Sequence, residues 1–299
     1  MKLRPFDPAN IRVSRSGGGG FPGGSGGKLG CGSLIVVLIG ALVFGIDPGQ
    51  MLGTVETLQQ QQQQPGARPA GTGTSATEIC NENQYALESC NALSSLNETW
   101  QPLFAQANVR FEQPTLNFYV GGTRSGCGAA QSAMGPFYCP ADHGIYIDTS
   151  FYDQLDRQLG APGDFARYYV MAHEFGHHVQ NLTGLADQVR SAQARDHAGA
   201  NALQVRMELQ ADCYAGVWAG RNRTLIEPGD MEEGLRAAAA IGDDTLQRSA
   251  GQTVNPESFT HGSSEQRMMW LRRGLETGND EACDTFADLR RQPTGRDRP

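Results

Sequence analysis

The sequence predicts an α+β fold: a mainly helical domain with a small β-sheet at a cleft, preceded by one transmembrane helix. Three observations support this prediction. Residues 164–182 contain no proline and repeat their apolar side chains at helical spacing. Residues 115–120 and 144–148 have the aromatic and β-branched composition of strands. Residues 29–46 form an uncharged run, which as a helix would span about 27 Å, close to the thickness of a hydrocarbon core.

The N-terminal part of the chain favours a membrane anchor. Residues 1–28 are rich in glycine with few apolar anchors, so we expect an arm that buries no core. Residues 29–46 could instead form a buried core helix or a cleaved signal peptide. A glycine-rich arm and a glutamine run flank them, which argues against a core helix, and Asp47-Pro48-Gly49 fits a cleavage site poorly. We therefore predict a single-pass anchor.

Charge predicts the orientation of this anchor. The arm carries a net charge of +4, which leaves −12 for the remainder of a chain whose total is −8. The positive-inside rule places the arm in the cytoplasm and the remainder in the periplasm or the extracellular space. An acidic exported part also argues against nucleic acid as a partner.

Cysteine usage agrees with an exported domain. Cys31 belongs to the predicted anchor, and the other six of the seven cysteines follow it. An even number of cysteines in an exported domain predicts disulfides, although six cysteines allow fifteen pairings. We expect Cys80–Cys90 and Cys127–Cys139, with Cys213–Cys283 as the third pair. A cysteine zinc site is disfavoured because no Cys-x-x-Cys occurs.

Beyond the anchor, composition divides the chain into three parts. Residues 47–76 contain a glutamine run followed by a Pro/Gly-rich stretch. This composition predicts a flexible linker. Residues 77–291 are predicted to form the folded domain, and residues 292–299 are predicted to form a disordered tail. The domain should begin with a helical region at residues 77–107, which Pro102 kinks or breaks. Its core candidates are Tyr85, Leu87, Leu93, Leu96, Trp100, Leu103 and Phe104.

The elements that follow are a small sheet and then helices. A further strand is expected near residues 137–139, between the two strands named above. A sheet edge beside a cleft can accept an extended peptide as an additional strand. The later helices are expected at residues 200–221, 229–248, 263–276 and 280–290.

The helix at residues 164–182 contains a His-Glu-x-x-His motif. His173 and His177 lie four apart, so their imidazoles project from one helix face. Two imidazoles so placed suit a tetrahedral zinc, and Glu174 lies where a general base would be needed. His178 points about 100° away from His177, and we interpret it as an ordinary polar helix residue.

A zinc site of this kind needs a third protein ligand. His143, His197 and His261 are candidates, as are many acids. Glu208 and Asp212 stand out because they lie four apart in an otherwise apolar helix, where an acid pair costs energy unless it is coordinated. One of them could ligate the metal while the other accepts a hydrogen bond from a ligand imidazole.

Three segments resemble a known family. Ala-His-Glu-Phe-Gly-His-His-Val-Gln at 172–180, Glu-Leu-Gln-Ala-Asp-Cys at 208–213 and Phe-Thr-His-Gly-Ser-Ser-Glu-Gln-Arg at 259–267 look like the YpfJ-type family of neutral zinc metallopeptidases. The glycine-rich arm and the anchor are similar too, so the resemblance covers most of the chain.

The resemblance implies roles for five residues. In the wider gluzincin group, which includes the membrane-bound CAAX-type proteases, the motif is followed by Glu-x-x-x-Asp and this Glu is the third ligand. Carried over, His173, His177 and Glu208 are metal ligands, Glu174 is the base, and Asp212 orients a ligand.

The CAAX-type proteases also have a His-Pro segment with an arginine six residues further on. His261 and Arg267 keep this spacing, but Gly262 replaces the proline, so the backbone here departs from the pattern. His261 could donate a hydrogen bond to the carbonyl oxygen on which charge develops during amide attack. It could equally be an ordinary residue near a helix N-terminus.

Taken together, these features predict a membrane-anchored zinc metallopeptidase, an endopeptidase that acts on peptides or proteins. Zinc lowers the pKa of a bound water, and Glu174 is expected to take the proton. Two alternatives remain: a non-catalytic zinc-dependent module that binds peptides, and a structural zinc site.

Overall fold

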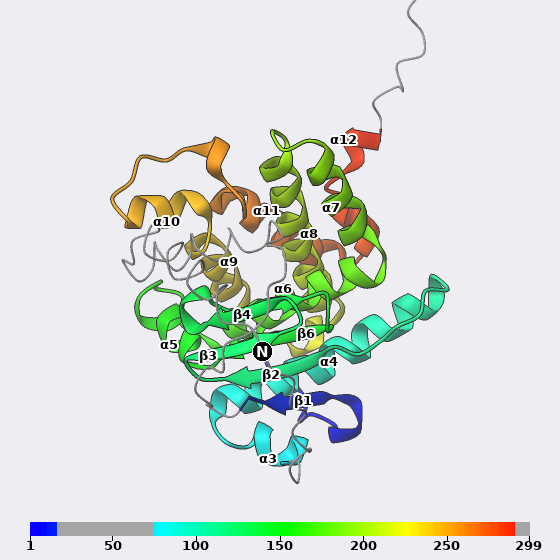
Figure 1. The fold of residues 1–299 in the computed structure, drawn as a ribbon. Helices are drawn as coiled ribbons and strands as arrows, with labels where there is room; N and C mark the ends of the chain where they lie inside the picture. The colour runs from blue at the N-terminus through cyan, green and yellow to red at the C-terminus, as the bar shows by residue number, and fades with distance from the viewer. Residues whose placement is uncertain (17–73, 291–299) are drawn as a thin grey trace, which may run out of the picture.

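The computed structural model describes residues 1–16 and 74–290, which form the predicted mainly helical α+β fold (Figure 1). The helices are α3 (Ala76–Cys80), α4 (Gln84–Gln106), α5 (Ser150–Arg157), α6 (Asp164–Leu182), α7 (Leu185–Arg195), α8 (Ala200–Arg221), α9 (Asp230–Ala240), α10 (Asp243–Ser249), α11 (Ser264–Thr277) and α12 (Ala287–Arg290). The strands are β1 (Arg12–Arg15), β2 (Thr115–Tyr119), β3 (Gly122–Ser125), β4 (Gly128–Gln131), β5 (Phe137–Cys139) and β6 (Gly144–Asp148). In Figure 1 the strands and α3 to α5 occupy the lower half, and α7 to α11 the upper half.

The main sheet has the strand order β1-β2-β6-β5. Strands β1, β2 and β6 are parallel, and β5 runs antiparallel to β6 at one edge. Every residue of β6 is buried, as expected for a strand covered on both faces. Strands β3 and β4 form a separate antiparallel hairpin. The predicted strands at residues 137–139 and 144–148 are therefore present, and β5 is left as an edge.

Helix α6 is the element around which the helices pack. All but four of its 19 residues are buried, and it contacts α4, α8 and α9. Its apolar face includes Phe165, Tyr169 and Phe175, each at most 2% exposed. Burial on nearly all sides explains why this helix is apolar around most of its circumference.

Helices α8 and α11 cross at very short range because glycines line their contact. A Cβ placed on Gly216 would lie 2.1 Å from the carbonyl oxygen of Leu271, and one on Gly274 would lie 2.0 Å from that of Cys213. No side chain fits at either position without moving a backbone. These glycines set the spacing between the two helices.

The first 16 residues are part of the fold. Met1 and Ile11 are buried in the main core, and Leu3, Phe6 and Val13 pack against it. The prediction that the N-terminal arm buries no core is therefore wrong for residues 1–16. The glycines on which this prediction was based begin only at Gly17. Three acids form a cluster near the starts of α6 and α9: Asp164, Asp230 and Glu233. The Met1 ammonium pairs with Asp164 at 3.1 Å and with Asp230 at 2.9 Å.

This arrangement contradicts the predicted membrane orientation. Strand β1 pairs with β2, Arg12 opposite Thr115, so the N-terminal residues and the domain lie on the same side of any membrane. A single pass at residues 29–46 would separate them. That segment lies outside the described residues, as do most of the predicted linker and the tail at 292–299. In the described part of the chain, no helix is long and apolar enough to cross a membrane. The predicted localisation is wrong.

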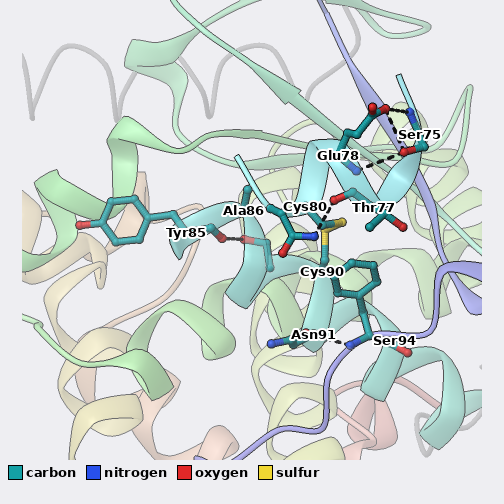
Figure 2. Close-up of a disulfide and its surroundings, with 12 residues drawn as sticks. Ser75, Thr77, Glu78, Cys80, Tyr85, Ala86, Cys90, Asn91 and Ser94 are labelled. Carbon is teal, nitrogen blue, oxygen red and sulfur yellow. Dashed lines mark hydrogen bonds between the residues drawn. A yellow bond between two sulfur atoms is a disulfide. The ribbon is translucent and has the colours of Figure 1, made fainter. Parts of the chain in front are cut away.

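The six cysteines after the predicted anchor pair as expected. Cys80–Cys90 joins α3 to α4, Cys127–Cys139 joins the hairpin to β5, and Cys213–Cys283 joins α8 to the C-terminal segment. Figure 2 shows the first of these, beside the capping contacts of Ser75 and Glu78 that start α3.

Several predicted boundaries differ from the structure. The region at 77–107 forms two helices, and Pro102 lies inside α4 without ending it. Pro102 cannot donate to the carbonyl of Glu98 one turn earlier, and both residues are exposed, so water can reach this carbonyl. The single helix expected at 229–248 is two, α9 and α10, separated at Gly242. The last helix, expected at 280–290, is a 3₁₀ turn (Asp280–Cys283) followed by α12.

Candidate metal centre

The two motif histidines lie one turn apart on α6, with ring centroids 4.8 Å apart. Gly176, between them, faces α8: a Cβ there would lie 2.9 Å from the Cα of Ala211. The absence of a side chain at Gly176 lets α8 approach α6 closely. This contact brings the acids of α8 to the histidines.

Glu208 is the acid that meets both histidines. Its Oε2 lies 3.1 Å from Nε2 of His173 and 3.4 Å from Nε2 of His177. One ligand atom from each of these three residues lies within 4.8 Å of the others. The other carboxylate oxygen of Glu208, Oε1, accepts a hydrogen bond from Nε2 of Gln204 at 2.8 Å. The structure thus brings together the three residues predicted as ligands.

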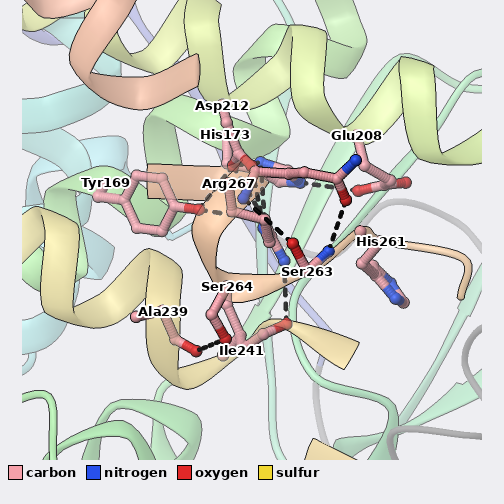
Figure 3. Close-up of polar contacts among 12 residues, drawn as sticks. Tyr169, His173, Glu208, Asp212, Ala239, Ile241, His261, Ser263, Ser264 and Arg267 are labelled. Carbon is pink, nitrogen blue, oxygen red and sulfur yellow. Dashed lines mark hydrogen bonds and ion pairs between the residues drawn. The ribbon is translucent and has the colours of Figure 1, made fainter. Parts of the chain in front are cut away.

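Asp212 lies one turn further along α8 and holds the first histidine. Its Oδ1 is 2.8 Å from Nδ1 of His173, and it also accepts a hydrogen bond from the Tyr169 hydroxyl at 2.6 Å. Arg267 of α11 donates to both carboxylate oxygens, each at 2.9 Å (Figure 3). Asp212 and Arg267 are 0% and 1% exposed, so this is a buried charge pair with its hydrogen bonds satisfied.

The second histidine has a partner that the sequence did not suggest. Nδ1 of His177 is 2.9 Å from Oε1 of Gln180, whose amide nitrogen donates to the Met207 carbonyl at 2.8 Å. Both histidines therefore have an oxygen acceptor at Nδ1, which orients Nε2 towards Glu208. Gln180 was missed because a glutamine inside a helix carries no signal for this role.

The acids of the site differ in their pKa. Burial alone would raise the pKa of Glu208, but His177 and His173 outweigh burial and hold it well below the usual range. Burial raises the pKa of Glu174, and the two neighbouring imidazoles only partly oppose this. A carboxylate whose pKa is raised toward neutrality is better matched to proton transfer at neutral pH.

Neighbouring carboxylates raise the pKa of both imidazoles. Burial alone would lower the pKa of His173, but Asp212 and Glu208 outweigh burial and raise it to about 10. Burial likewise opposes protonation of His177, yet Glu208 raises its pKa. A metal ion that binds at these nitrogens must displace the protons.

The cluster lies in a cavity of about 440 Å³. Its lining comes from the β3–β4 hairpin, β5, α6, α7 and α8, and it includes Glu174 and His261. Apolar side chains contribute to the lining, among them Leu159, Val170, Ile241 and Leu246. The cavity is therefore bounded by the sheet edge on one side and by helices on the other.

His261 is held by an aspartate that sequence reasoning did not single out. Its Nδ1 is 3.1 Å from Oδ1 of Asp243, while Oδ2 of Asp243 accepts backbone N–H groups from Thr260, His261 and Gly262. Gly262 has φ +93°, which proline cannot adopt, so the departure from His-Pro reflects a different backbone here.

The remaining histidine candidates do not join the cluster. Within the described residues, the groups that could hold a metal include neither His143 nor His197. His178 is buried rather than solvated. Its Nε2 is 2.6 Å from the Glu112 carbonyl, and its Nδ1 is 3.0 Å from the hydroxyl of Tyr138 in β5. It links the metal-site helix to the sheet edge.

The fold and the site together define an α+β protein in which two histidines and one carboxylate line one cavity. Two histidines and one carboxylate are a donor set of zinc metallopeptidases. The sequence profile of the family described as "Putative neutral zinc metallopeptidase" matches residues 6–286. The chain is 46% identical over 276 residues to the protein YpfJ of Escherichia coli (strain K12). This alignment covers 90% of each of the two chains. It is 39% identical over 267 residues to the protein Rv2575 of Mycobacterium tuberculosis (strain H37Rv), covering 83% of this chain and 86% of the relative.

The chain belongs to this neutral zinc metallopeptidase family. The profile begins at residue 6, so it includes the N-terminal segment that supplies β1. No solved protein structure is significantly similar to this fold.

Proposed function

We propose that this protein is a zinc-dependent endopeptidase. The observation that carries the proposal is the cluster of His173, His177 and Glu208 beside Glu174 in one cavity. Three candidate zinc ligands next to a candidate general base support this activity. Peptides or unfolded protein segments are the proposed substrates.

The donor set fits zinc. Two imidazole nitrogens and one carboxylate oxygen are ligands that zinc accepts, and three protein ligands leave a position open for catalysis. Both imidazoles are already oriented through Nδ1, by Asp212 and Gln180. Zinc bound here would act as a Lewis acid and lower the pKa of water at the site.

Glu174 is proposed to move the proton. It accepts a proton from the attacking water and returns it to the leaving amine, a transfer for which its raised pKa is suited. His261 lines the same cavity, and its Nδ1–H donates to Asp243. In its imidazolium form, His261 is proposed to donate from Nε2–H to the substrate carbonyl oxygen.

Strand β5 is proposed to bind the substrate backbone. It is an edge strand in the described sheet, and its residues Phe137 and Tyr138 line the cavity. An extended peptide can add to such an edge through main-chain hydrogen bonds. The apolar side chains in the cavity lining favour a substrate with apolar side chains.

Two acids with different roles provide the test. Glu174→Gln keeps all three ligands, so it should retain one zinc by elemental analysis and lose about 10² to 10⁴ in kcat on an unfolded protein substrate. Glu208→Ala removes a ligand, so both zinc and activity should be lost. The matched control is Glu265→Ala, an exposed acid on α11, which should change neither.

The same measurements separate the two alternatives. A peptide-binding module without catalysis would bind zinc and peptide but cleave nothing in the wild type. A structural zinc site would tolerate Glu174→Gln without loss of any function. Normal cleavage by Glu174→Gln would contradict the proposed mechanism.

A further inference from the structure

The β3–β4 hairpin, residues 122–131, forms one wall of the cavity. Ser125, Gly128, Ala129 and Ala130 of this hairpin line the cavity, as does Cys127 at its tip. The hairpin is a two-stranded sheet of its own, separate from the main sheet. A two-stranded hairpin is at best marginally stable in water, so its position depends on what attaches it to the rest of the protein.

Apolar packing contributes little to this attachment. Ala130 and Thr123 are the buried side chains of the hairpin, and both are small. The attachments are instead polar or covalent. At the base, Asp148 accepts hydrogen bonds from the Gly121 backbone and the Ser132 hydroxyl.

At the tip, two contacts hold the hairpin. Oδ2 of Asp142 accepts the Gly126 backbone N–H at 2.6 Å, and the disulfide Cys127–Cys139 joins the tip to the edge strand β5. The covalent contact therefore links the hairpin directly to the strand that is proposed to bind substrate.

This disulfide also differs from the other two in accessibility. Cys80, Cys90 and Cys213 are 0% exposed and Cys283 is 1% exposed, so a solute cannot reach either of their disulfides in the folded protein. Cys127 is exposed at the tip of the hairpin, whereas its partner Cys139 is buried. Thiol–disulfide exchange requires access of a thiolate to a sulfur atom.

We propose that Cys127–Cys139 is a site of thiol modification, and that its reduction releases the cavity wall and weakens substrate binding. A small thiolate attacks the sulfur of Cys127, forms a mixed disulfide there and displaces Cys139 as a thiolate. A second thiol then releases Cys127, so two thiols are oxidised to one disulfide while the two cysteines take up two electrons and two protons. The effect on substrate rests on the proposed peptidase function.

The test compares the three disulfides in the full-length zinc-loaded protein. The protein is treated with a trialkylphosphine, which does not remove zinc as a dithiol would, and free thiols are then alkylated and located by mass spectrometry. Cys127 and Cys139 should be alkylated first, and the other four cysteines only after denaturation. Hydrogen exchange should accelerate at residues 122–131 and remain unchanged in α6 and α8.

A peptide substrate gives the functional readout. Reduction should raise KM roughly three- to tenfold, because the wall is no longer held in its binding position, and leave kcat and zinc content nearly unchanged. The double variant Cys127→Ser/Cys139→Ser should reproduce this change without reductant. The matched control is Cys80→Ser/Cys90→Ser. Cys80 and Cys90 are 10 residues apart in the sequence, and Cys127 and Cys139 are 12 apart, so the two disulfides constrain the unfolded chain to a similar degree.

Reduction of all three disulfides at one rate would overturn the proposal, as would unchanged hairpin exchange or unchanged KM after selective reduction. The alkylation order and the hydrogen exchange need no substrate. They decide this inference even if the wild type cleaves no peptide, an outcome that contradicts the proposed function alone.

Discussion

Helices α6, α8 and α11 on one side of the cavity and the β3–β4 hairpin on the other differ in what holds them in place. The helices cross at glycines, bury the candidate metal ligands and share the charge pair of Asp212 and Arg267. The buried side chains of the hairpin are small, and its attachments include Ser16, Asp142, Asp148 and one disulfide. The groups that would perform chemistry are thus part of the core, whereas the wall that would contact substrate is attached to it at a few points.

This difference predicts that a single change in the helices costs far more stability than one in the hairpin. It also predicts that changes in the hairpin alter KM rather than metal binding. Three substitutions test the comparison.

The largest effect is expected for Arg267→Ala. This change leaves the carboxylate of Asp212 buried without its charged partner, which should reduce the free energy of unfolding by about 3–5 kcal/mol. His173 would lose its fixed orientation as well, so zinc affinity should fall. Denaturant unfolding and elemental analysis provide the measurements.

Arg157→Ala is the control for this change. Arg157 forms an exposed pair with Asp153, and exposed pairs contribute little. An equal loss of stability in both variants would show that burial does not increase the contribution of the Asp212–Arg267 pair to stability.

An intermediate effect is expected for Gly216→Ala. The added Cβ would meet the Leu271 carbonyl oxygen and the Leu275 nitrogen at 2.1 and 2.7 Å, and neither backbone atom can rotate away. Overpacking of this kind should cost about 1–3 kcal/mol in thermal or denaturant unfolding. Arg272→Ala, on the exposed face of α11, should stay within about 0.5 kcal/mol of wild type. A stable Gly216→Ala variant would refute the close crossing of α8 and α11.

The smallest effect is expected for Asp142→Ala. Loss of its hydrogen bonds to Gly126, Gly144 and Tyr146 should cost about 1 kcal/mol, because Asp142 is exposed and water can replace it. The variant should keep its zinc and show a higher KM for peptides. If zinc were lost instead, the hairpin and the metal centre would not be independent.

The helices of the metal centre could be predicted from the sequence because their signals are local. A proline-free apolar repeat and a His-Glu-x-x-His spacing locate α6, and an acid pair in an apolar helix locates Glu208 and Asp212 on α8. Three disulfide pairings are also confirmed. The roles of these residues as ligands and base remain predictions that the proposed measurements address.

The parts that could not be predicted depend on contacts distant in sequence. Strand β1 carries one apolar residue, Val13, between charged and polar ones, and it becomes a strand only because β2 offers an edge. Gln180 and Asp243 orient histidines through bonds that no local pattern encodes. The hairpin is rich in glycine and alanine, and Thr123 is its one β-branched residue among the two strands.

The pairing of β1 with β2 has a consequence for how the protein folds. Ser14 and Asn117, neighbours across these strands, are 103 residues apart in the chain. Parallel pairing over such a separation requires closure of a long loop before any contact forms, and this slows folding. The residues synthesised first should therefore be among the last to dock, and until they do the far edge of β2 stays open to pairing with another chain.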